Sequence, residues 1–180
     1  MSVPPFPLPL PDPLLSDGDL HLRPWTSSDA PVLAAAWTDP EIARWTGVPD
    51  QHDEAAAVRW INGDRDRRAR GLSLDLVAVV DDAIVGEVGL SGIDATGRTA
   101  DIGWWVVAHR RGRGLATRAA ILLADWAVAE LSIDAVLARC HQDNPSSAGV
   151  ARAAGFRPVG QEGPIELWSL AIDGGATLGP

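Results

Sequence analysis

The sequence contains no lysine and no tyrosine, and its only cysteine is Cys140. All 15 basic residues are therefore arginines, so no lysine amine can serve as a base or nucleophile. The lack of tyrosine excludes any mechanism in which a phenol delivers a proton to a leaving group. One cysteine cannot form an intramolecular disulfide or a metal cluster, and we expect no metal site.

The chain also lacks a long apolar run. No stretch approaches the ~20 apolar residues that a membrane-spanning helix needs. The segment 1–19 is apolar but contains six prolines, and it has no basic leader before an uninterrupted apolar stretch. This pattern argues against a signal peptide. These absences predict a cytoplasmic protein without a membrane partner.

Basic residues are outnumbered by acidic ones. The chain has 24 Asp and Glu residues against 15 arginines, which gives a formal net charge of −9. Non-specific binding to nucleic acid needs a basic surface, so we expect no nucleic-acid partner. An acidic protein favours cationic substrates such as amines, although acidity also serves solubility.

The length and composition suit one domain. The chain has 180 residues, and 46% of them are hydrophobic, which is enough for a single core. We divide it into a proline-rich N-terminal arm at 1–19, a domain at 20–172 and a C-terminal tail at 173–180.

Local patterns predict an α/β (α+β) fold. Several apolar runs are separated by short turns, at 81–82 and 95–97 for example, which is typical of antiparallel strands. The predicted strands are 20–25, 74–80, 83–93, 99–107, 135–141, 157–161 and 165–172. The predicted helices are 26–37, a short one from 39, 53–70, 114–131 and 146–154. We therefore expect a mixed, mostly antiparallel sheet of about seven strands flanked by helices.

The most informative stretch is the loop that precedes the helix 114–131. It reads His-Arg-Arg-Gly-Arg-Gly-Leu-Ala-Thr from His109 to Thr117. Its glycines allow the backbone to approach a ligand closely, and the unpaired N–H groups at a helix start can bind phosphate oxygens. Arginines at 110, 111, 113 and 118 add local positive charge. The loop is either an anion site or a solvated basic turn.

Two common nucleotide sites do not fit this loop. A dinucleotide-binding fingerprint needs a third glycine where Thr117 stands, and it normally lies in an early βαβ unit. A nucleoside-triphosphate loop needs a lysine, which the chain lacks.

The loop and its surroundings resemble the GNAT superfamily of acyl-CoA-dependent N-acyltransferases. The superfamily pattern of Arg or Gln, two residues, Gly, one residue, then Gly or Ala is matched by Arg111, Gly114 and Ala116. The preceding Asp-Ile-Gly-Trp-Trp-Val-Val at 101–107 is similar to the fourth strand of that fold.

Two further segments resemble one branch of the superfamily, which contains the ribosomal-protein N-terminal acetyltransferases. These are Asp-Asn-Pro-Ser-Ser-Ala-Gly-Val at 143–150, followed by Ala-Gly-Phe at 154–156, and Leu-Arg-Pro-Trp at 22–25. The resemblance covers about 20–172. It implies a GNAT-like sheet whose fourth strand carries a bulge and splays from the fifth.

The resemblance implies that acetyl-CoA is the co-substrate. The backbone expected to hold its pyrophosphate comprises Arg111, Gly112, Arg113, Gly114, Leu115, Ala116 and Thr117. The side chains of Arg110, Arg113 and Arg118 either reach phosphates or are only solvated.

The acyl-pantetheine arm would lie in the gap between the splayed strands. Val106, Val107 and Ala108 would pair with it as an added strand would, and an N–H near Val106 would face the thioester oxygen. Asn144 would bond the pantetheine amides, or else it caps the helix that starts near Ser146.

Two residues are candidates for catalysis. In the resembling branch, a serine at the position of Ser147 is proposed to donate a proton to the departing thiolate; the alternative is a structural helix residue. Glu87, inside an apolar strand, is the first candidate for a base that deprotonates the amine, and the alternative is an outward-facing strand residue. Asp101 and His109 are weaker candidates. Cys140 is not expected to carry the acyl group.

The predicted function is transfer of an acetyl group directly from acetyl-CoA to a primary amine. A non-catalytic acyl-CoA-binding module or sensor is the alternative. Protein N-termini and small-molecule amines both remain candidate acceptors. Trp45 and Trp60 are candidates for an aromatic wall of the acceptor site or for core packing. The protein is expected to be a monomer or a homodimer.

Overall fold

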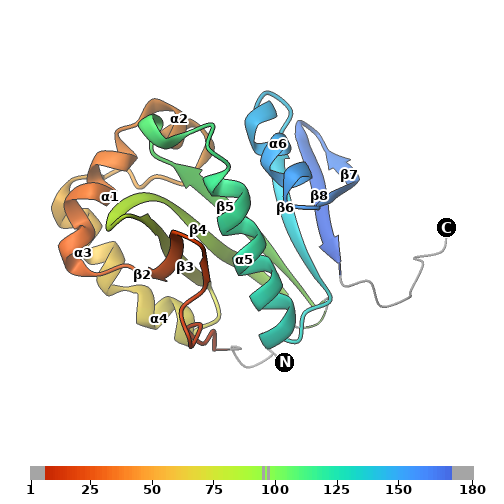
Figure 1. Cartoon of the computed structure of the whole chain (residues 1–180), viewed down its shortest axis with the longest axis horizontal. Helices are drawn as coiled ribbons and strands as arrows, with labels where there is room; N and C mark the ends of the chain where they lie inside the picture. Colours follow the sequence, from red (N-terminus) through yellow and green to blue (C-terminus); the bar gives the residue numbers. More distant parts are fainter. Residues whose placement is uncertain (1–6, 95, 97, 172–180) are drawn as a thin grey trace.

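A central sheet organises the molecule (Figure 1). The computed structural model describes residues 7–94, 96 and 98–171, and within them the sheet has eight strands in the order β1-β2-β3-β4-β5-β6-β8-β7. Adjacent strands are antiparallel except β5 and β6. The strands are β1 (Ser16–Asp17), β2 (Leu20–Pro24), β3 (Ser73–Val80), β4 (Ala83–Asp94), β5 (Thr99–Val106), β6 (Ala135–His141), β7 (Arg157–Glu162) and β8 (Ile165–Ala171).

Helices cover both faces of the sheet and create two cores. On one face, α5 packs its buried alanines and leucines against the strands (Figure 1). On the other face, α1, α2 and α3 pack against the sheet and form a smaller core. The sheet contributes Val77, Val79 and Trp105 to this core, and Trp25 joins them from just after β2. The helices are α1 (Ala30–Trp37), α2 (Pro40–Trp45), α3 (Glu54–Asn62), α4 (Asp64–Ala69), α5 (Leu115–Glu130) and α6 (Pro145–Ala153).

The predicted mixed, mostly antiparallel sheet is confirmed, with two differences in detail. The helix predicted at 53–70 is wrong as one element, because the chain breaks at Gly63 into α3 and α4. β1 was not predicted, because a two-residue polar strand has no alternating pattern to detect. The turn predicted at 95–97 includes residues 95 and 97, which lie outside the described residues.

The described part of the proline-rich arm is attached to the domain. Leu8 is 2% exposed and belongs to the larger core. Its N–H donates to the carbonyl oxygen of Arg68 at 2.9 Å, and Nη1 of Arg68 donates to the carbonyl oxygen of Leu8 at 3.2 Å. β1 then pairs with β2. The arm therefore joins α4 to the sheet.

β5 and β6 splay apart, as the resemblance implied. Their parallel pairing covers Thr99–Ile102 opposite Ala135–Ala138 and then stops. β5 continues to pair with β4 as far as Val106, while β6 continues to pair with β8 as far as His141. The expected bulge is not at this end of β5, because its pairing with β4 keeps one register from Asp101 to Val106.

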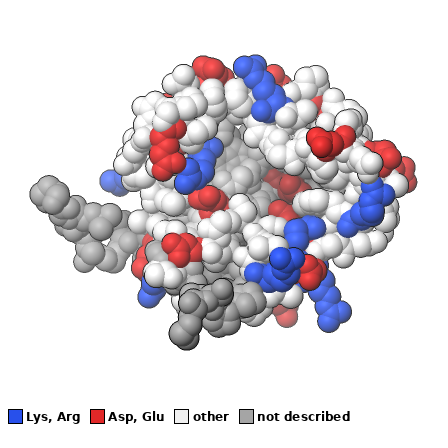
Figure 2. Space-filling model, turned by 180° about the vertical axis from the view of Figure 1, so that it is seen from behind, with Lys and Arg blue, Asp and Glu red and all other residues white. Residues whose placement is uncertain are grey.

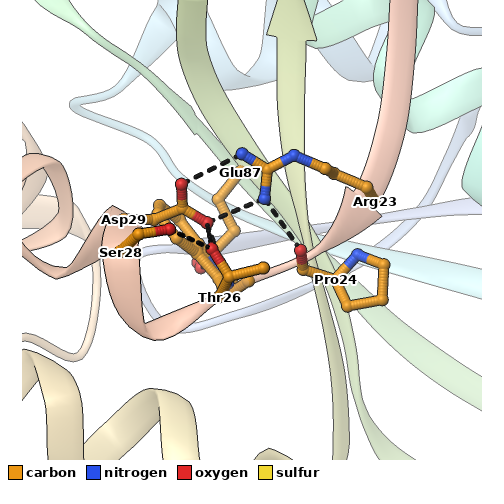
Figure 3. Close-up of polar contacts among 7 residues, drawn as sticks. Arg23, Pro24, Thr26, Ser28, Asp29 and Glu87 are labelled. Carbon is orange, nitrogen blue, oxygen red and sulfur yellow. Dashed lines mark hydrogen bonds and ion pairs between the residues drawn. The ribbon is translucent and has the colours of Figure 1, made fainter.

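A charged corner fixes the connection from β2 to α1 (Figure 3). The guanidinium of Arg23 donates to both carboxylate oxygens of Asp29, at 2.7 and 3.0 Å, and Asp29 also accepts from the N–H of Thr26 at 2.8 Å. This is the capping arrangement that Thr26 and Asp29 predict from sequence. The corner places Trp25, which is 7% exposed, inside the smaller core.

Gly86 of β4 is required by a close backbone approach beside the splay. A Cβ atom at Gly86 would lie 2.2 Å from the carbonyl oxygen of Trp105 and 3.1 Å from the Cα of Val106. Because both contacts are with backbone atoms, no side-chain rotation relieves them.

We therefore expect Gly86→Ala to lower the free energy of unfolding by about 1–3 kcal/mol, as overpacking does. Gly160→Ala on the exposed strand β7 is the matched control, since its Cβ would have only an ordinary contact at 3.7 Å with Leu167. Denaturant unfolding measures both variants. Equal stabilities of the two variants would contradict the steric argument.

Candidate active site

Two cavities meet at the splay. The first, here called the sheet cavity, has a volume of about 780 Å³ and is lined by strands β3 to β6 and the start of β8. Its strand residues are Asp75, Glu87, Gly89, Leu90, Ser91, Ile102, Gly103, Trp104, Trp105, Ala138, Arg139, His141 and Ile165. The second, here called the loop cavity, has a volume of about 470 Å³. The end of β5, the loop before α5 and the first turn of α5 line it with Val106, Arg110, Arg111, Gly112, Gly114, Leu115, Ala116 and Thr117.

Six residues line both cavities: Trp45, Thr46, Trp104, Trp105, Asn144 and Ser147. They come from the end of α2, from β5 and from the start of α6, so they surround the opening that the splay creates. The molecule is hollowed on the face opposite to that of Figure 1, and acidic side chains lie in the hollow (Figure 2). A ligand in one cavity can therefore contact a ligand in the other.

The loop cavity has the features of an anion site. Gly112 and Gly114 have φ values of +74° and +73°, a conformation that favours glycine. The first helical hydrogen bond at the start of α5 is donated by the backbone N–H of Arg118 to the carbonyl oxygen of Gly114. The N–H groups of Leu115, Ala116 and Thr117 are the unpaired donors of a helix start, and they line this cavity.

One arginine of the loop also suits an anion. The Nε atom of Arg110 is buried without a hydrogen-bond partner in the described part of the chain, and Arg110 lines the loop cavity. A buried, unpartnered guanidinium nitrogen is costly, so a phosphate oxygen is a fitting partner.

The other loop arginines have protein partners. Arg111 donates from Nη2 to Asp39 at 2.9 Å and from Nε to the carbonyl oxygen of Val106 at 2.9 Å. Arg118 binds the carboxylates of Asp17 and Asp19, at 2.7 and 2.8 Å. Arg118 therefore anchors the N-terminal arm and is not free to reach a phosphate.

Not every expected residue reaches a cavity. Among the described residues, Val107, Ala108 and Arg113 line neither cavity. The N–H of Val107 donates to Val85, and its carbonyl oxygen accepts from the N–H of Arg110. Of the three positions expected to pair with pantetheine, only Val106 faces the loop cavity.

Asn144 and Ser147 lie together at the start of α6. The side-chain oxygen of Asn144 accepts from the N–H of Ser147 at 3.1 Å, so the capping role proposed for Asn144 is present. Both residues also line both cavities. The Ser147 hydroxyl lies 3.4 Å from the Sγ of Cys140. Burial raises the pKa of that thiol, which leaves it a poor nucleophile.

Glu87 is held by two tryptophans. Trp25 donates from Nε1 to Oε2 of Glu87 at 2.7 Å, and Trp105 donates from Nε1 to Oε1 at 3.0 Å. The two indoles are stacked at 6.3 Å. Glu87 lines the sheet cavity, so its carboxyl is fixed in orientation and still accessible to a ligand.

Glu87 has a strongly shifted pKa. Desolvation by burial, followed by the negative charge of Asp75, raises the pKa of Glu87 from its ordinary 4.5 to about 8, although the two indole donors act in the opposite direction. Burial also raises the pKa of Asp75. Carboxyl groups whose pKa is shifted by burial and by a neighbouring charge are typical of functional sites.

Some lining residues escaped the sequence analysis. Asp75 and His141, which line the sheet cavity, were not singled out, and neither was Trp25, which donates to Glu87, because their neighbours come from distant parts of the chain. Trp45 does line both cavities, and its ring lies 5.3 Å from that of His141. Trp60 instead packs edge-on against Trp37 in the smaller core. The weaker base candidate Asp101 binds Arg139 at 3.3 Å and lines neither cavity.

A sequence model of the acetyltransferase (GNAT) domain matches residues 19–157. The chain belongs to the GNAT acetyltransferase family. Its relatives include the uncharacterized N-acetyltransferase p20 of Bacillus licheniformis, which is 25% identical over 143 residues. The match covers 78% of this chain and 80% of that protein.

Solved structures of other acetyltransferases share the fold. A ribosomal-protein-alanine acetyltransferase from Vibrio fischeri has a TM-score of 0.78 at 20% identity, over 89% of this chain and 97% of that one. A microcin self-immunity acetyltransferase in complex with acetyl-CoA and AMP has a TM-score of 0.76 at 22% identity, over 87% and 94%.

These findings support an acyl-CoA-dependent N-acetyltransferase and do not favour a non-catalytic module. In the described ranges, no helix of this GNAT protein is long and apolar enough to cross a membrane. In the same part of the chain, no three His, Cys, Asp or Glu residues are grouped so that they could hold a metal ion.

The pKa of Glu87 predicts how stability depends on pH. The folded protein keeps Glu87 protonated up to about pH 8, whereas a glutamate with its ordinary pKa of 4.5 is already ionised at that pH in the unfolded chain. The stability that this difference contributes is complete below the lower value and is lost as pH rises through the higher one.

We therefore expect the wild-type free energy of unfolding to fall more steeply between about pH 5 and about pH 9 than that of Glu87→Gln, which cannot titrate. Denaturant unfolding at several pH values measures the free energy of unfolding of both proteins. Glu54→Gln at the exposed start of α3 is the control and should follow the wild type. Parallel profiles for Glu87→Gln and the wild type would contradict the shift.

Proposed function

We propose that the enzyme transfers an acetyl group directly from acetyl-CoA in the loop cavity to a primary amine in the sheet cavity. The observation that carries this proposal is the splay, because it joins the two cavities through a shared set of residues. Relatives whose solved structures contain acetyl-CoA or CoA support the choice of donor.

The residues of the loop cavity fit the donor. Backbone N–H groups at the start of α5 and the buried Nε of Arg110 would hold the pyrophosphate. The Thr117 hydroxyl can add a donor. The pantetheine arm would run past Val106 and Asn144 into the opening, and the thioester would lie near Ser147.

The residues of the sheet cavity suit the amine. The amine nitrogen must be neutral to attack the thioester carbon, and an ionised Glu87 can accept its proton. The C–N bond then forms, the C–S bond breaks, and CoA leaves as a thiolate. The Ser147 hydroxyl donates a hydrogen bond to that thiolate, which is a tolerable leaving group because a thiol pKa is about 8.5.

The class of acceptor, the cellular location and the oligomeric state are also part of the proposal. The amine is a protein N-terminus or a small-molecule amine, and relatives named as ribosomal-protein acetyltransferases favour including N-terminal peptides in any screen. We also propose that the chain acts in the cytoplasm as a monomer or homodimer, with the arm at 1–19, the catalytic domain at 20–172 and the tail at 173–180.

The direct test is an acceptor screen. Acetyl-CoA is mixed with peptides, aminoglycosides, polyamines and amino acids, free thiol is followed, and products are identified by mass. Thiol release with an acetylated product supports the proposal. Binding of acetyl-CoA without product from any amine would favour the non-catalytic alternative.

Ser147→Ala should lower kcat far more than it lowers the affinity for acetyl-CoA, because only the developing thiolate needs the hydroxyl. Steady-state kinetics and calorimetry with acetyl-CoA measure the two effects. Ser169→Ala on β8, which lies outside both cavities, is the matched control. Wild-type turnover in Ser147→Ala would remove Ser147 from the mechanism.

Glu87→Gln should lower kcat/KM by about 10²–10⁴-fold, the usual contribution of a positioned base. In the wild type, kcat/KM should rise with pH through about 8, because only the ionised Glu87 accepts a proton. The acceptor amine titrates as well, so the profile is measured with two amines of different pKa. A rise that follows only the amine, and that persists in Glu87→Gln, would show that Glu87 is not the base.

A further inference from the structure

Two glycines form a trough across the floor of the sheet cavity. Gly89 of β4 is paired with Asp75 of β3 on one side and with Gly103 of β5 on the other, so the three residues form one row across the sheet. All three line the sheet cavity. We call Gly89 and Gly103 the glycine trough, and Asp75 lies at its β3 end.

The trough is empty space that side chains would fill. A Cβ atom at Gly103 would have no neighbour within 4 Å, whereas one at Gly89 would lie 2.7 Å from Oδ1 of Asp75. Gly89 therefore lets the Asp75 carboxylate extend over the strand, and Gly103 leaves the path from the splay to that carboxylate open. Two strand spacings separate β3 from β5, which is about 10 Å.

The trough runs beside the proposed base. Glu87 and Trp105 form the next row on the same face, two residues along their strands and therefore about 7 Å away. An acceptor whose amine lies between Glu87 and Ser147 can thus place the rest of its length over the glycines, with its far end at Asp75.

One oxygen of Asp75 has its partners in the protein and the other faces the trough. Oδ2 accepts from the Ser73 hydroxyl at 2.7 Å and lies 3.6 Å from Nε of Arg67. No donor from the described ranges makes a hydrogen bond to Oδ1, the oxygen over Gly89. The Asp75 side chain is only 16% exposed, so this oxygen gains from a ligand donor.

Anchoring Arg67 does not account for this arrangement. Arg67 also donates from Nη1 to the carbonyl oxygen of Trp60 at 2.7 Å and stacks over the Trp60 ring at 4.2 Å. These contacts, together with the ion pair to Oδ2 of Asp75, are enough to hold Arg67 in place. Oδ1 of Asp75 is not needed for that role.

We infer that the glycine trough is a subsite for the part of the acceptor beyond its reacting amine, and that Oδ1 of Asp75 binds a hydrogen-bond donor carried there. The donor is a hydroxyl, an amide N–H or a second ammonium. A carboxylate or phosphate would face the negative charge of Asp75 in a desolvated site, and that of Glu87 once it ionises, and is excluded. This inference rests on the proposed function, because it assumes that the sheet cavity holds the amine.

The first test compares linear primary amines of equal length that end in a hydroxyl, an ammonium, a methyl or a carboxylate group. The wild type should prefer a donor-bearing amine over the methyl-terminated one by about 10- to 100-fold in kcat/KM, as a hydrogen bond to a charged group implies. Asp75→Ala should abolish this preference, and Asp75→Asn, which keeps an acceptor oxygen, should retain part of it. Comparison of the hydroxyl and ammonium arms identifies the donor.

Asp125→Asn on the exposed side of α5 is the control for loss of one negative charge, and it should keep the full preference. No preference in the wild type, an unchanged preference in Asp75→Ala, or a preference for the carboxylate would overturn the inference. Calorimetric binding of the same amines in the presence of CoA gives the comparison without turnover. If every amine binds as predicted but none is acetylated, the proposed function fails and the subsite remains.

The second test fills the trough. Gly103→Ala adds a methyl group that contacts no protein atom within 4 Å, so we expect normal folding and normal acetyl-CoA affinity. The KM of the preferred long amine should rise by about tenfold, while that of a short amine that does not reach the trough should stay the same. Gly160→Ala is the matched control. An equal change for long and short amines, or no change for either, would contradict the placement.

Discussion

The structure depends on one interruption of hydrogen bonding. The parallel ladder between β5 and β6 ends at Ile102 and Ala138, and each strand then continues with its outer neighbour alone. Unpaired backbone groups in a sheet need partners. The interruption therefore leaves an opening through the sheet that a ligand with amide groups can fill, and the loop cavity and the sheet cavity meet there. The close approach of Gly86 to Trp105 lies at the same end of β5.

Charge is separated between the two sides of this opening. The loop cavity combines helix-start N–H groups with the unpartnered Nε of Arg110, although the chain as a whole carries a charge of −9. The sheet cavity contains the carboxyls of Glu87 and Asp75, and burial raises the pKa of each because it destabilises the ionised form. A cationic or donor-bearing ligand would offset that cost for the ionised carboxylates. This separation supports our proposal that an anionic donor and an amine acceptor bind on opposite sides of one thioester.

Sequence alone could predict what local pattern determines. Periodicity predicted seven of the eight strands, and local composition singled out the loop from Arg110 to Thr117, because each is a contiguous segment. Asn144 and Ser147 were singled out through the resemblance to the GNAT superfamily. Glu87 was found because a carboxylate inside an apolar run is unusual. The hydrogen bond from Trp25 to Glu87, and the row that Asp75, Gly89 and Gly103 form across the sheet, depend on contacts between segments far apart in sequence. The break at Gly63 and the capture of Arg118 by the N-terminal arm depend likewise on tertiary contacts.

The most direct measurement is a crystal structure of the enzyme with a non-hydrolysable thioether analogue of acetyl-CoA. We predict that the pyrophosphate contacts the N–H groups at the start of α5. The pantetheine should lie between β5 and β6 beyond Ile102 and Ala138, with the sulfur next to Ser147 and the acyl group facing Glu87. A pantetheine outside the splay, or strands β5 and β6 paired through their full length in the complex, would contradict the account.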